Sequence, residues 1–535
     1  MTPDADVIDP EVDPRATWAV DPQEVRRLAE HVVTSPGAGV HLTRSPLTDA
    51  PLAQVPLSTP EDVGSAVARV RLAQRLWART PLRGRARVLL RVHDLVLDRQ
   101  SEVLDLIQLE SGKARASAYE EVADVALVAR HYARGVERYL APRRVRGLVP
   151  GLTGVTIHRH PVGVVGVVAP WNYPLTLALG DTLTALAAGN GVVVKPDLQT
   201  SLTTLWAVDL LLEAGLPEGL VQVVTGDGPG VGARLVDSVD HVVFTGSTAT
   251  GRTVAESAGR RLVGATLELG GKNALYVADD AAPDIAAEGA VRACFANTGQ
   301  LCVSVERIVL HEGVADAFLA AFVPRVRALR LGAGLDYSAD VGSLTSAAQL
   351  ERVQDHVEDA LARGATVLTG AVHRPDVGPL FYEPTVLSDV PPDAVLSTEE
   401  TFGPVVSVQR VRDDDDALAV INGSDHGLNA SVWTADVARG RRLAVRIEAG
   451  TVNVNDGYTA VWGSTAAPMG GVKDSGLGRR HGAEGIWSTT WTQTVAVQRG
   501  THGGWGLGRL YALPAERWTR VFTGALRVMK ALGLR

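Results

Sequence analysis

Short apolar runs rich in β-branched residues alternate with stretches of helical periodicity across the middle of the chain. We predict strands at residues 162–168, 191–195, 221–225 and 241–245. Helices are predicted between them, near residues 175–188, 202–214 and 230–235. Strands that alternate with helices indicate an α/β fold, in which a parallel sheet is covered on both faces. Such sheets bind ligands at the carboxyl ends of their strands.

Before this region, the sequence predicts an irregular extension followed by a series of helices. Residues 1–50 read as an irregular N-terminal extension with one helix near residues 22–33. A clear helix is predicted to begin after Thr59, because Thr59 can cap it and Pro60 suits its first turn. The acidic residues that follow favour the positive end of the helix dipole. Further helices are expected as far as about residue 139.

A second α/β region is predicted from about residue 269 to residue 487. It contains an acidic run at residues 413–416, which we interpret as a solvated loop or a helix start without a function of its own. No tandem repeat is visible in the chain.

The C-terminal tail is amphipathic. From residue 505 onward, Trp518, Val521, Phe522, Leu526 and Met529 are interspersed with arginine and lysine. A basic amphipathic helix can contact a membrane surface. Packing on a neighbouring subunit is the simpler interpretation, and it is the one that the sequence favours.

Composition narrows the class of protein. The 535 residues carry a net charge of −8, and a net negative charge is not typical of a nucleic-acid-binding protein. Two cysteines make neither a disulfide framework nor a zinc site, so we expect a reducing, cytoplasmic setting and no metal centre. The acidic, proline-rich N-terminus predicts no secretory signal, and no apolar run reaches the roughly twenty residues of a membrane span.

The strongest chemical signal is a cysteine paired with a carboxylate, each beside glycines. Cys302 ends the run Phe295-Ala-Asn-Thr-Gly-Gln-Leu-Cys302, and Glu268 lies in Leu267-Glu-Leu-Gly-Gly-Lys-Asn273. A thiolate attacks carbonyl groups well, and a carboxylate can manage protons and water. Taken alone, a cysteine is more often a small buried apolar residue, which is what we expect of Cys294.

Two turns after predicted strands suggest a dinucleotide. In Phe244-Thr-Gly-Ser-Thr-Ala-Thr-Gly251, Gly246 permits a tight turn, and the next helix can hold a phosphate at its N-terminus. Lys195 ends another strand of the same sheet, where it can bond ribose hydroxyls or a phosphate. In isolation a surface lysine is an equal interpretation of Lys195.

Two further motifs offer polar groups at tight turns. Asn172, between Pro170 and Pro174, can donate to an oxyanion, although a capping asparagine is the plainer interpretation. Glu400 and Phe402 place a carboxylate and an aromatic ring together, which suits a ribose and a flat nicotinamide ring.

These residues together resemble the NAD(P)-dependent aldehyde dehydrogenase family over about residues 50–500. The shared motifs are Pro170-Trp-Asn-Tyr-Pro174, Lys195-Pro196, Phe244-Thr-Gly-Ser247, Leu267-Glu-Leu-Gly-Gly-Lys272, Gly299-Gln-Leu-Cys302, Glu400-Thr-Phe-Gly-Pro404 and Gly470-Gly-Val-Lys-Asp-Ser-Gly476. The resemblance implies a Rossmann-like cofactor-binding domain, a second α/β catalytic domain and a small β element for oligomerisation.

The resemblance also implies boundaries for these parts. After the extension at residues 1–50, the cofactor-binding domain takes residues 51–145 and 165–268, and the catalytic domain takes residues 269–487. The oligomerisation element takes residues 146–164 and 488–500, and the tail takes residues 501–535. A homodimer or homotetramer is expected, bridged by the segments near residues 148–160 and 490–498.

Residue roles follow from the resemblance. Cys302 matches the nucleophile that forms a thioester, Asn172 the oxyanion donor, and Glu268 the base that activates water for thioester hydrolysis. The residues that match the cofactor site are Trp171, Lys195, Gly246, Ser247, Leu269, Glu400 and Phe402. The presence of Cys302, Glu268 and Asn172 argues against a non-catalytic protein on this fold, and Glu268 favours a free carboxylic acid as the product.

Cofactor choice is expected to involve the residues after Lys195. Strict NAD users of the family often have a glutamate at the position of Leu198, and a neutral residue there does not repel a 2′-phosphate. NADP is therefore expected to be accepted, although the acidic Asp197 weakens this argument and leaves NAD as the alternative.

The substrate is a small aldehyde, and its class stays open between two alternatives. Residues 187–190, 195–200 and 458–480 most resemble actinobacterial succinate-semialdehyde dehydrogenases of the NADP type, which makes succinate semialdehyde the first expectation. The arginines that hold the substrate carboxylate in that subgroup are absent, because Gly180 and Ala296 take their places. Either Arg292, Ser464 or Tyr458 binds the carboxylate, or the enzyme oxidises hydrophobic fatty or aromatic aldehydes.

Overall fold

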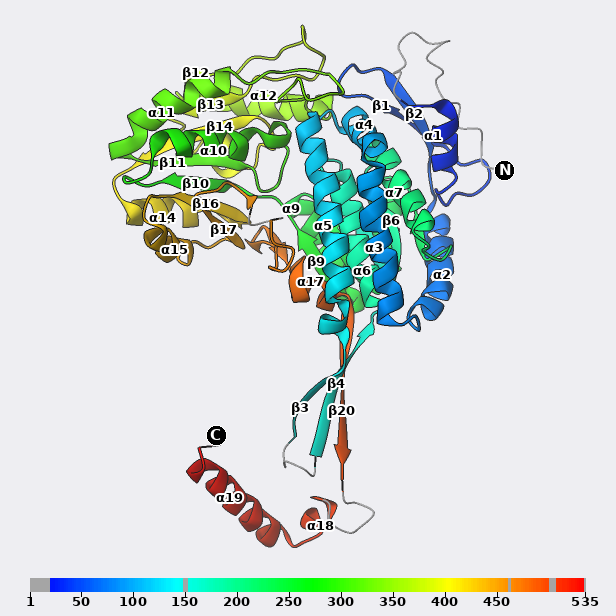
Figure 1. The fold of residues 1–535 in the computed structure, drawn as a ribbon. Coiled ribbons are helices and arrows are strands. Elements are labelled where there is room, and N and C mark those ends of the chain that lie inside the picture. The colour runs from blue at the N-terminus through cyan, green and yellow to red at the C-terminus, as the bar shows by residue number, and fades with distance from the viewer. Residues whose placement is uncertain (1–19, 148–152, 460–462, 500–506, 534–535) are drawn as a thin grey trace. The chain divides into compact units, whose positions relative to one another are not determined.

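The computed structural model describes residues 20–147, 153–459, 463–499 and 507–533 (Figure 1). The chain divides into two units, and each is described by itself. The larger unit consists of Met1–Val136 and Pro161–Thr489, and the smaller unit of Glu137–His160 and Thr490–Arg535. Residues 1–19 of the predicted N-terminal extension and parts of the bridging segment and tail (148–152, 500–506 and 534–535) lie outside the described residues.

The strands predicted in the first half of the chain lie together in one six-stranded sheet. Its order is β19 (Gly476–Leu477), β9 (Gly264–Glu268), β8 (His241–Thr245), β5 (Val164–Val168), β6 (Gly191–Lys195) and β7 (Val221–Val223). Only the pairing of β19 with β9 is antiparallel. Parallel strands buried on both faces give the continuous apolar runs of the sequence, and the predicted α/β fold is confirmed.

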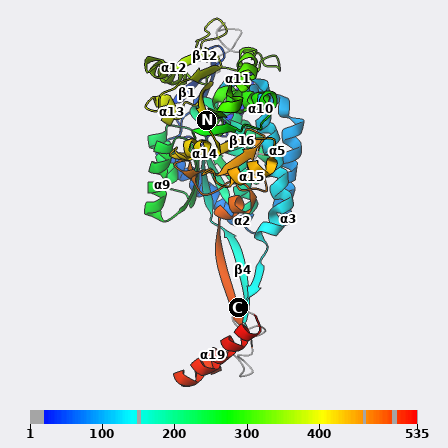
Figure 2. The same ribbon diagram turned by 90° about the vertical axis from the view of Figure 1, so that its left-hand side faces the viewer.

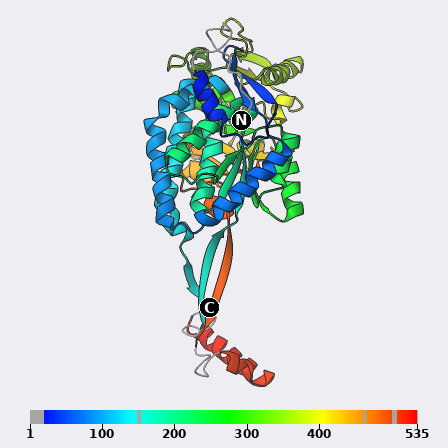
Figure 3. The same cartoon turned by 90° about the vertical axis from the view of Figure 1, so that its right-hand side faces the viewer.

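Helices pack on this sheet. Helix α2 (Pro60–Trp77), α8 (Ala233–Val236) and α9 (Thr248–Arg261) share one apolar cluster with Val164, Val193 and Val242 of the strands. Helix α6 (Asp181–Ala188) packs against β5 and β6 and also contacts α3 (Leu82–Asp98). The other helices of this part are α1 (Pro22–Ala29), α4 (Gln100–Ser111), α5 (Arg115–Leu140) and α7 (Ser201–Glu213), and Figure 3 shows the N-terminal ones in blue and cyan.

Helix α2 begins as the sequence predicts. The Thr59 hydroxyl accepts a hydrogen bond from the Asp62 N–H, and an Asp62 carboxylate oxygen accepts one from the Thr59 N–H at 2.8 Å. This reciprocal capping box satisfies two N–H groups that the first turn would otherwise leave unpaired. Val63, Val70 and Trp77 are buried along the helix.

Helix α1 is shorter than predicted, because it ends at Ala29 instead of near residue 33. The Val33 N–H donates to the Val223 carbonyl at 2.9 Å, and Val32 forms a parallel bridge with Val223. Pairing with the edge strand β7 therefore takes the residues that a longer helix would have used.

A second difference from the prediction lies at residues 176–180. The helix predicted near residues 175–188 begins there with the π-helix η1 (Thr176–Gly180), and α6 follows it.

The second α/β region is built on a seven-stranded sheet. Its order is β12 (Thr366–Thr369), β13 (Thr385–Ser388), β14 (Val405–Val411), β11 (Val305–His311), β10 (Asn273–Val277), β16 (Asn429–Trp433) and β17 (Thr451–Val454). Only the pairing of β12 with β13 is antiparallel.

Alternate residues of the β10 strand face two helical layers. Leu275 and Val277 pack with α10 (Pro283–Phe295) and α11 (Glu312–Arg327), whereas Ala274 and Tyr276 pack with α14 (Asp414–Asn422) and α15 (Val437–Ala444). Figure 2 labels these helices around the sheet. The remaining elements of this half are α12 (Ala347–Ala362), α13 (Val395–Thr398), β15 (His426–Gly427), β18 (Val472–Lys473) and α17 (Gly482–Ser488).

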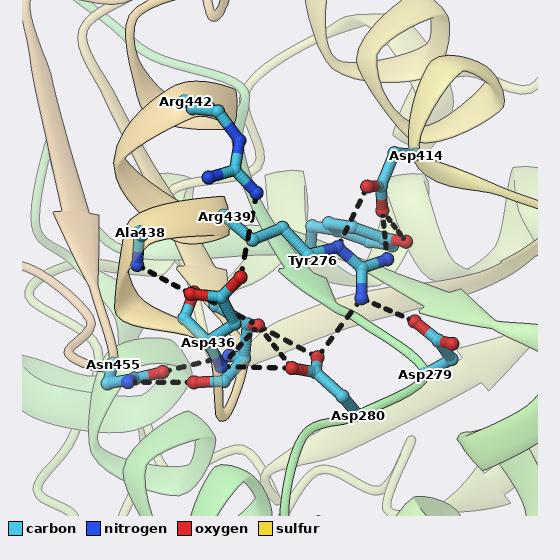
Figure 4. Close-up of polar contacts among 10 residues, drawn as sticks. Tyr276, Asp279, Asp280, Asp414, Asp436, Ala438, Arg439, Arg442 and Asn455 are labelled. Atoms are coloured by element: carbon cyan, nitrogen blue, oxygen red, sulfur yellow. Dashed lines mark hydrogen bonds and ion pairs between the residues drawn. The ribbon is translucent and has the colours of Figure 1, made fainter.

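The acidic run is the start of α14, as one of its two interpretations predicted, and Asp413 caps that helix. Asp414 is not merely solvated. It accepts hydrogen bonds from Arg439 on α15 at 2.6 Å and from the Tyr276 hydroxyl of β10 at 2.8 Å. Arg439 also pairs with Asp279 and Asp280 after β10, so this network fastens two helices to the end of one strand (Figure 4).

The smaller unit contains a three-stranded sheet with the order β20 (Thr490–Gln498), β4 (Thr153–Pro161) and β3 (Arg143–Arg146). Its C-terminal part has two helices, α18 (Leu507–Tyr511) and α19 (Ala515–Ala531). The domain boundaries implied by the family resemblance, including the oligomerisation element, stay predictions. No helix among the described residues is long and apolar enough to cross a membrane.

Candidate active site

Cys302 lies after a loop with unusual backbone geometry. Helix α10 ends at Phe295, and Asn297, Thr298 and Gly299 then adopt left-handed conformations with φ of 51°, 58° and 70°. A Cβ atom on Gly299 would collide with the carbonyl oxygen of Gly403, so only glycine allows the close approach of these two segments. Backbone strain of this kind persists where surrounding contacts hold it, and it is frequent at functional sites.

Cys302 is half-buried and has a free thiol. Its carbonyl oxygen accepts a hydrogen bond from the Asn273 side-chain amide at 2.7 Å. Burial of the thiol raises its pKa to about 12, and the carboxylates of Glu400 and Glu268 add to this shift. The sulfur therefore holds its proton at neutral pH in the resting protein. Cys294 is buried in the apolar cluster of α10 and α11, as expected.

Glu268 ends strand β9 and is buried. Neither of its carboxylate oxygens has a hydrogen-bond partner in the part of the chain that the structure describes. Burial raises the pKa of Glu268 to about 8, while Arg480 lowers it and Asp181 raises it further. A carboxyl group with free oxygens and a pKa near neutrality can both take up and release a proton under physiological conditions.

Asn172 follows strand β5 and is held by a buried ion pair. Its backbone carbonyl accepts a hydrogen bond from the Lys113 ammonium at 2.6 Å, and Lys113 pairs with Glu121 at 2.7 Å. Glu121 also accepts the Leu175 N–H at 2.8 Å, which fixes the chain on the far side of the turn. The Asn172 side-chain amide donates to the Gln300 carbonyl at 3.1 Å, and this leaves its second N–H for a ligand.

A cavity of about 230 Å³ lies next to Cys302. Nine of the residues that the sequence singled out line it: Trp171, Asn172, Gly246, Ser247, Glu268, Leu269, Cys302, Glu400 and Phe402. Gln349 and Arg352 complete the lining together with Pro170, Thr245 and Gly270. The fold therefore brings together motifs that are separated by more than two hundred residues in the sequence.

The lining of this cavity fits a dinucleotide. Ser247 caps α9, a helix of 14 residues, and the amides of its first turn suit a phosphate. The rings of Trp171 and Phe402 meet edge to face at 5.4 Å. Glu400 accepts the Gly271 N–H at 2.9 Å, and a Cβ on Gly270 would lie 2.5 Å from its other oxygen.

A second buried ion pair positions Glu400 and Phe402. Lys272 pairs with Glu306 at 2.5 Å, and the Glu306 carboxylate accepts the backbone N–H groups of Thr401 and Phe402 at 3.0 and 2.9 Å. Burial raises the pKa of Glu400 to about 8, with Glu306 adding to the shift. The chain has only five lysines, Lys113, Lys195, Lys272, Lys473 and Lys530, and this scarcity draws attention to Lys272, whereas no sequence feature indicated Glu306.

Lys195, Asp197 and Leu198 do not line the cavity around Cys302. Lys195 is buried at the end of β6, where burial lowers the pKa of its ammonium, and its Nζ donates to the Pro196 carbonyl at 3.3 Å. Asp197 accepts the Gln199 N–H at 2.9 Å and caps the short turn η2 (Leu198–Thr200). The roles of these three residues in cofactor binding stay predictions.

Cys302 and Asn172 also line a second, smaller cavity of about 80 Å³. The other lining residues are Glu120, Asp124, Tyr173, Thr176, Leu177, Leu301, Val303, Tyr458, Met469, Arg480 and His481. Of the three residues considered for a substrate carboxylate, Tyr458 lines this cavity and Ser464 is exposed outside it. Arg292 does not line it, but contacts two lining residues, the Tyr458 hydroxyl at 3.3 Å and the Glu120 carboxylate at 3.0 Å.

Three charged residues of the smaller cavity, Glu120, Asp124 and Arg480, had not been singled out from the sequence. Arg480 donates through Nε to Asp181 at 2.8 Å, and its Nη2 would lie 3.8 Å from a Cβ on Gly180. Asp124 is buried and its oxygens have no hydrogen-bond partner among the described residues. Burial raises the pKa of Asp124 to about 6, although the charge of Arg480 opposes the shift.

The chain belongs to the aldehyde dehydrogenase family, whose model matches residues 35–495. It is 49% identical over 485 residues to a protein of Mycolicibacterium smegmatis that is provisionally named succinate-semialdehyde dehydrogenase (NADP+), covering 91% of this chain and 93% of that one. It is 36% identical to the mitochondrial succinate-semialdehyde dehydrogenase of Oryza sativa subsp. japonica, covering 83% of each.

Solved structures agree with this assignment. Betaine aldehyde dehydrogenase of Staphylococcus aureus, solved in complex with NAD+, superposes with a TM-score of 0.83 at 29% identity, covering 88% of this chain and 96% of that one.

Among the described residues, no cluster of three or more His, Cys, Asp or Glu side chains could hold a metal ion.

Proposed function

We propose that the protein oxidises an aldehyde to its carboxylic acid with NADP+, through a thioester on Cys302. The observation that carries this proposal is that Cys302 lines both cavities, one suited to a dinucleotide and one suited to a small aldehyde. When bound, the nicotinamide accepts two electrons and a proton from the aldehyde carbon. Trp171, Gly246, Ser247, Leu269, Glu400 and Phe402 would hold the cofactor.

Cys302 supplies the nucleophile. Because the pKa of its thiol is about 12, the thiol must lose its proton as the sulfur attacks the carbonyl carbon. Glu268, with two free oxygens and a pKa of about 8, is the group that can take this proton, directly or through water. The N–H of Asn172 that Gln300 does not use is available to the oxyanion.

Hydrolysis completes the reaction. Glu268 first releases the thiol proton to solvent and then takes a proton from a water molecule, whose oxygen attacks the thioester carbonyl and displaces the Cys302 thiolate. Asn172 can donate to the same oxyanion in this second step. The thiolate then regains a proton, and the product leaves as a carboxylate.

Succinate semialdehyde is the substrate that we propose first. The names of the similar proteins support it, and so does Arg480, which lies beside the position where the expected arginine is replaced by Gly180. A cavity of about 80 Å³ suits a short aldehyde better than a long one. The alternative, a hydrophobic aldehyde, is favoured by the apolar side chains of Leu177, Leu301, Val303 and Met469 in the same lining.

The experiment that tests this choice compares kcat/KM for succinate semialdehyde, butanal and benzaldehyde with NADP+ and NAD+. Arg480→Lys keeps the positive charge beside Asp181 but removes the planar fork that bonds a carboxylate. We expect the KM for succinate semialdehyde to rise about tenfold in this variant, since charge-assisted bonds of roughly 1.5–3 kcal/mol weaken, while butanal kinetics stay unchanged. The substrate assignment would be wrong if the wild type had a higher kcat/KM for butanal and Arg480→Lys changed the kinetics of both substrates equally. The dehydrogenase assignment would remain intact in that case.

Asp124 provides a second measurement on the same pocket. Its ionised carboxylate opposes an anionic substrate, so the KM for succinate semialdehyde should fall as the pH drops through about 6 and Asp124 takes up a proton. Asp124→Asn should give the low KM already at pH 7.5. A higher KM in Asp124→Asn would instead indicate a substrate that donates hydrogen bonds to this carboxylate.

We propose further that the enzyme works in the cytoplasm as a homodimer or homotetramer. The two cysteines are free, which suits a reducing compartment. The sheet of β20, β4 and β3 is the element that would bridge subunits, and the cofactor-binding and catalytic domains would take the six-stranded and the seven-stranded sheet.

A further inference from the structure

Helix α19 lies beyond the family match, which ends at residue 495. It contains 17 residues from Ala515 to Ala531, and none of them is buried. A helix with no fully buried residue gains little stability from packing among the described residues, so its amphipathic pattern needs another explanation.

One side of α19 is apolar along its whole length. At 100° per residue, Trp518, Val521, Phe522, Ala525, Met529 and Leu532 fall on one face of the helix axis. The ring of Trp518 packs edge to face against Tyr511 at 5.4 Å and against Phe522 at 6.3 Å. Val521 and Leu526 remain more than half exposed.

The opposite side of α19 is cationic. It presents Arg517, Arg520, Arg527 and Lys530 against a single acidic residue, Glu516, although the chain as a whole has a net charge of −8. Arg520 lies 3.8 Å from Glu516 in a fully exposed pair, which contributes little. The basic residues are therefore concentrated where they can meet an anionic surface.

We propose that α19 binds the surface of a membrane that contains anionic lipids. Its apolar face would enter the boundary between headgroups and acyl chains, and its arginines and lysine would contact the lipid phosphates. A second copy of the same helix would cover the apolar face but leave the basic side without a partner, whereas an anionic membrane surface accounts for both sides. This inference goes beyond the proposed oxidation and does not depend on it.

The test measures sedimentation of the full-length protein with vesicles of phosphatidylcholine, with and without about one third phosphatidylglycerol. We expect binding only to the anionic vesicles and loss of binding at high salt. Arg520→Glu combined with Arg527→Glu should weaken binding at least 25-fold, since each basic residue contributes roughly fivefold. Phe522→Asp should abolish it by placing a charge on the apolar face.

Matched control variants lie in the larger unit. Arg87→Glu combined with Arg441→Glu makes the same change of net charge at two exposed arginines, and Val437→Asp places a charge at another exposed apolar residue. We expect all variants to keep wild-type dehydrogenase rates and the controls to keep vesicle binding. No binding to anionic vesicles, equal binding to neutral ones, or equal loss in the controls would overturn the proposal. A lower molar mass of the α19 variants by light scattering, together with unchanged vesicle binding, would also overturn the proposal, because α19 would then pack on a second copy.

Discussion

Cys302 and Glu268 are both protonated, wholly or largely, at neutral pH in the resting protein. Their pKa values of about 12 and about 8 have the same principal cause, burial next to other carboxylates. A neutral thiol is protected from oxidation, because the thiolate is the reactive form. The sulfur is thus expected to react when a carbonyl carbon and a proton acceptor are both in place.

Replacing the sulfur provides the most direct prediction at the residue scale. Cys302→Ala should reduce aldehyde oxidation below detection while NADP+ still binds, as measured by fluorescence titration. Cys294→Ala is the control, because Cys294 is buried among apolar side chains and its loss should cost about 1 kcal/mol of stability without affecting the rate. Normal turnover in Cys302→Ala would refute the thioester mechanism.

The pH dependence of the rate should report the Glu268 carboxyl group. Only its ionised form can take a proton, so the hydrolysis rate should rise as the pH increases through about 8 and level off above it. Glu268→Gln should remove this rise and allow the thioester to accumulate in rapid-mixing experiments. An unchanged pH profile in that variant would assign the ionisation to another group.

Sequence reasoning found nine residues of the larger cavity but missed Gln349 and Arg352 there, and Arg480 and Asp124 of the smaller cavity. Those nine residues lie in glycine-rich or proline-rich turns, which are visible in the sequence; Gly246 and Ser247 after strand β8 are examples. Asp124 lies on helix α5 and Arg480 follows β19, so only the folded chain brings the two together. The scarcity of lysine was the one signal that could have found Lys113.

At the scale of elements, the loop before Cys302 depends on the turn at Gly403. Gly299→Ala should destabilise the protein by about 2 kcal/mol or more, because alanine is strained at a φ of 70° and its Cβ would collide with the Gly403 carbonyl. Displacement of this turn should also lower kcat.

Gly259→Ala on helix α9 is the matched control, since its Cβ would meet no atom within 4 Å. It should leave the rate unchanged and raise stability by up to about 1 kcal/mol. Thermal denaturation of both variants measures the difference. Equal melting temperatures for Gly299→Ala and the wild type would contradict the described loop geometry.

Element prediction succeeded where local chemistry decided the outcome. The cap at Thr59 and the strands at residues 191–195 and 241–245 are where the sequence placed them. It was less accurate where a distant segment competes, as at Val33, which pairs with the edge strand β7 instead of extending a helix. The buried pairs Lys113–Glu121 and Lys272–Glu306 also join residues whose proximity no local pattern indicates.

At the scale of the whole molecule, the sheet of the smaller unit should be covered in an oligomer. Trp491, Val495 and Val497 of β20 point to the same face at a spacing of two and are each more than one third exposed. Light scattering should give at least twice the chain mass of 56.4 kDa. Val495→Asp combined with Val497→Asp should lower that mass, whereas Val445→Asp, at an exposed residue of the larger unit, should not.

The position of Cys302 in two linings has a practical consequence for inhibitor design. An electrophilic warhead delivered from either chamber would meet the same sulfur, so a covalent compound can be elaborated toward Trp171 and Phe402 or toward Arg480 and Asp124. Arg480 and Asp124 carry opposite charges in the smaller cavity, so a zwitterionic extension of the compound would pair with both of them. Such an extension would not compete with a dinucleotide, which would bind in the larger cavity.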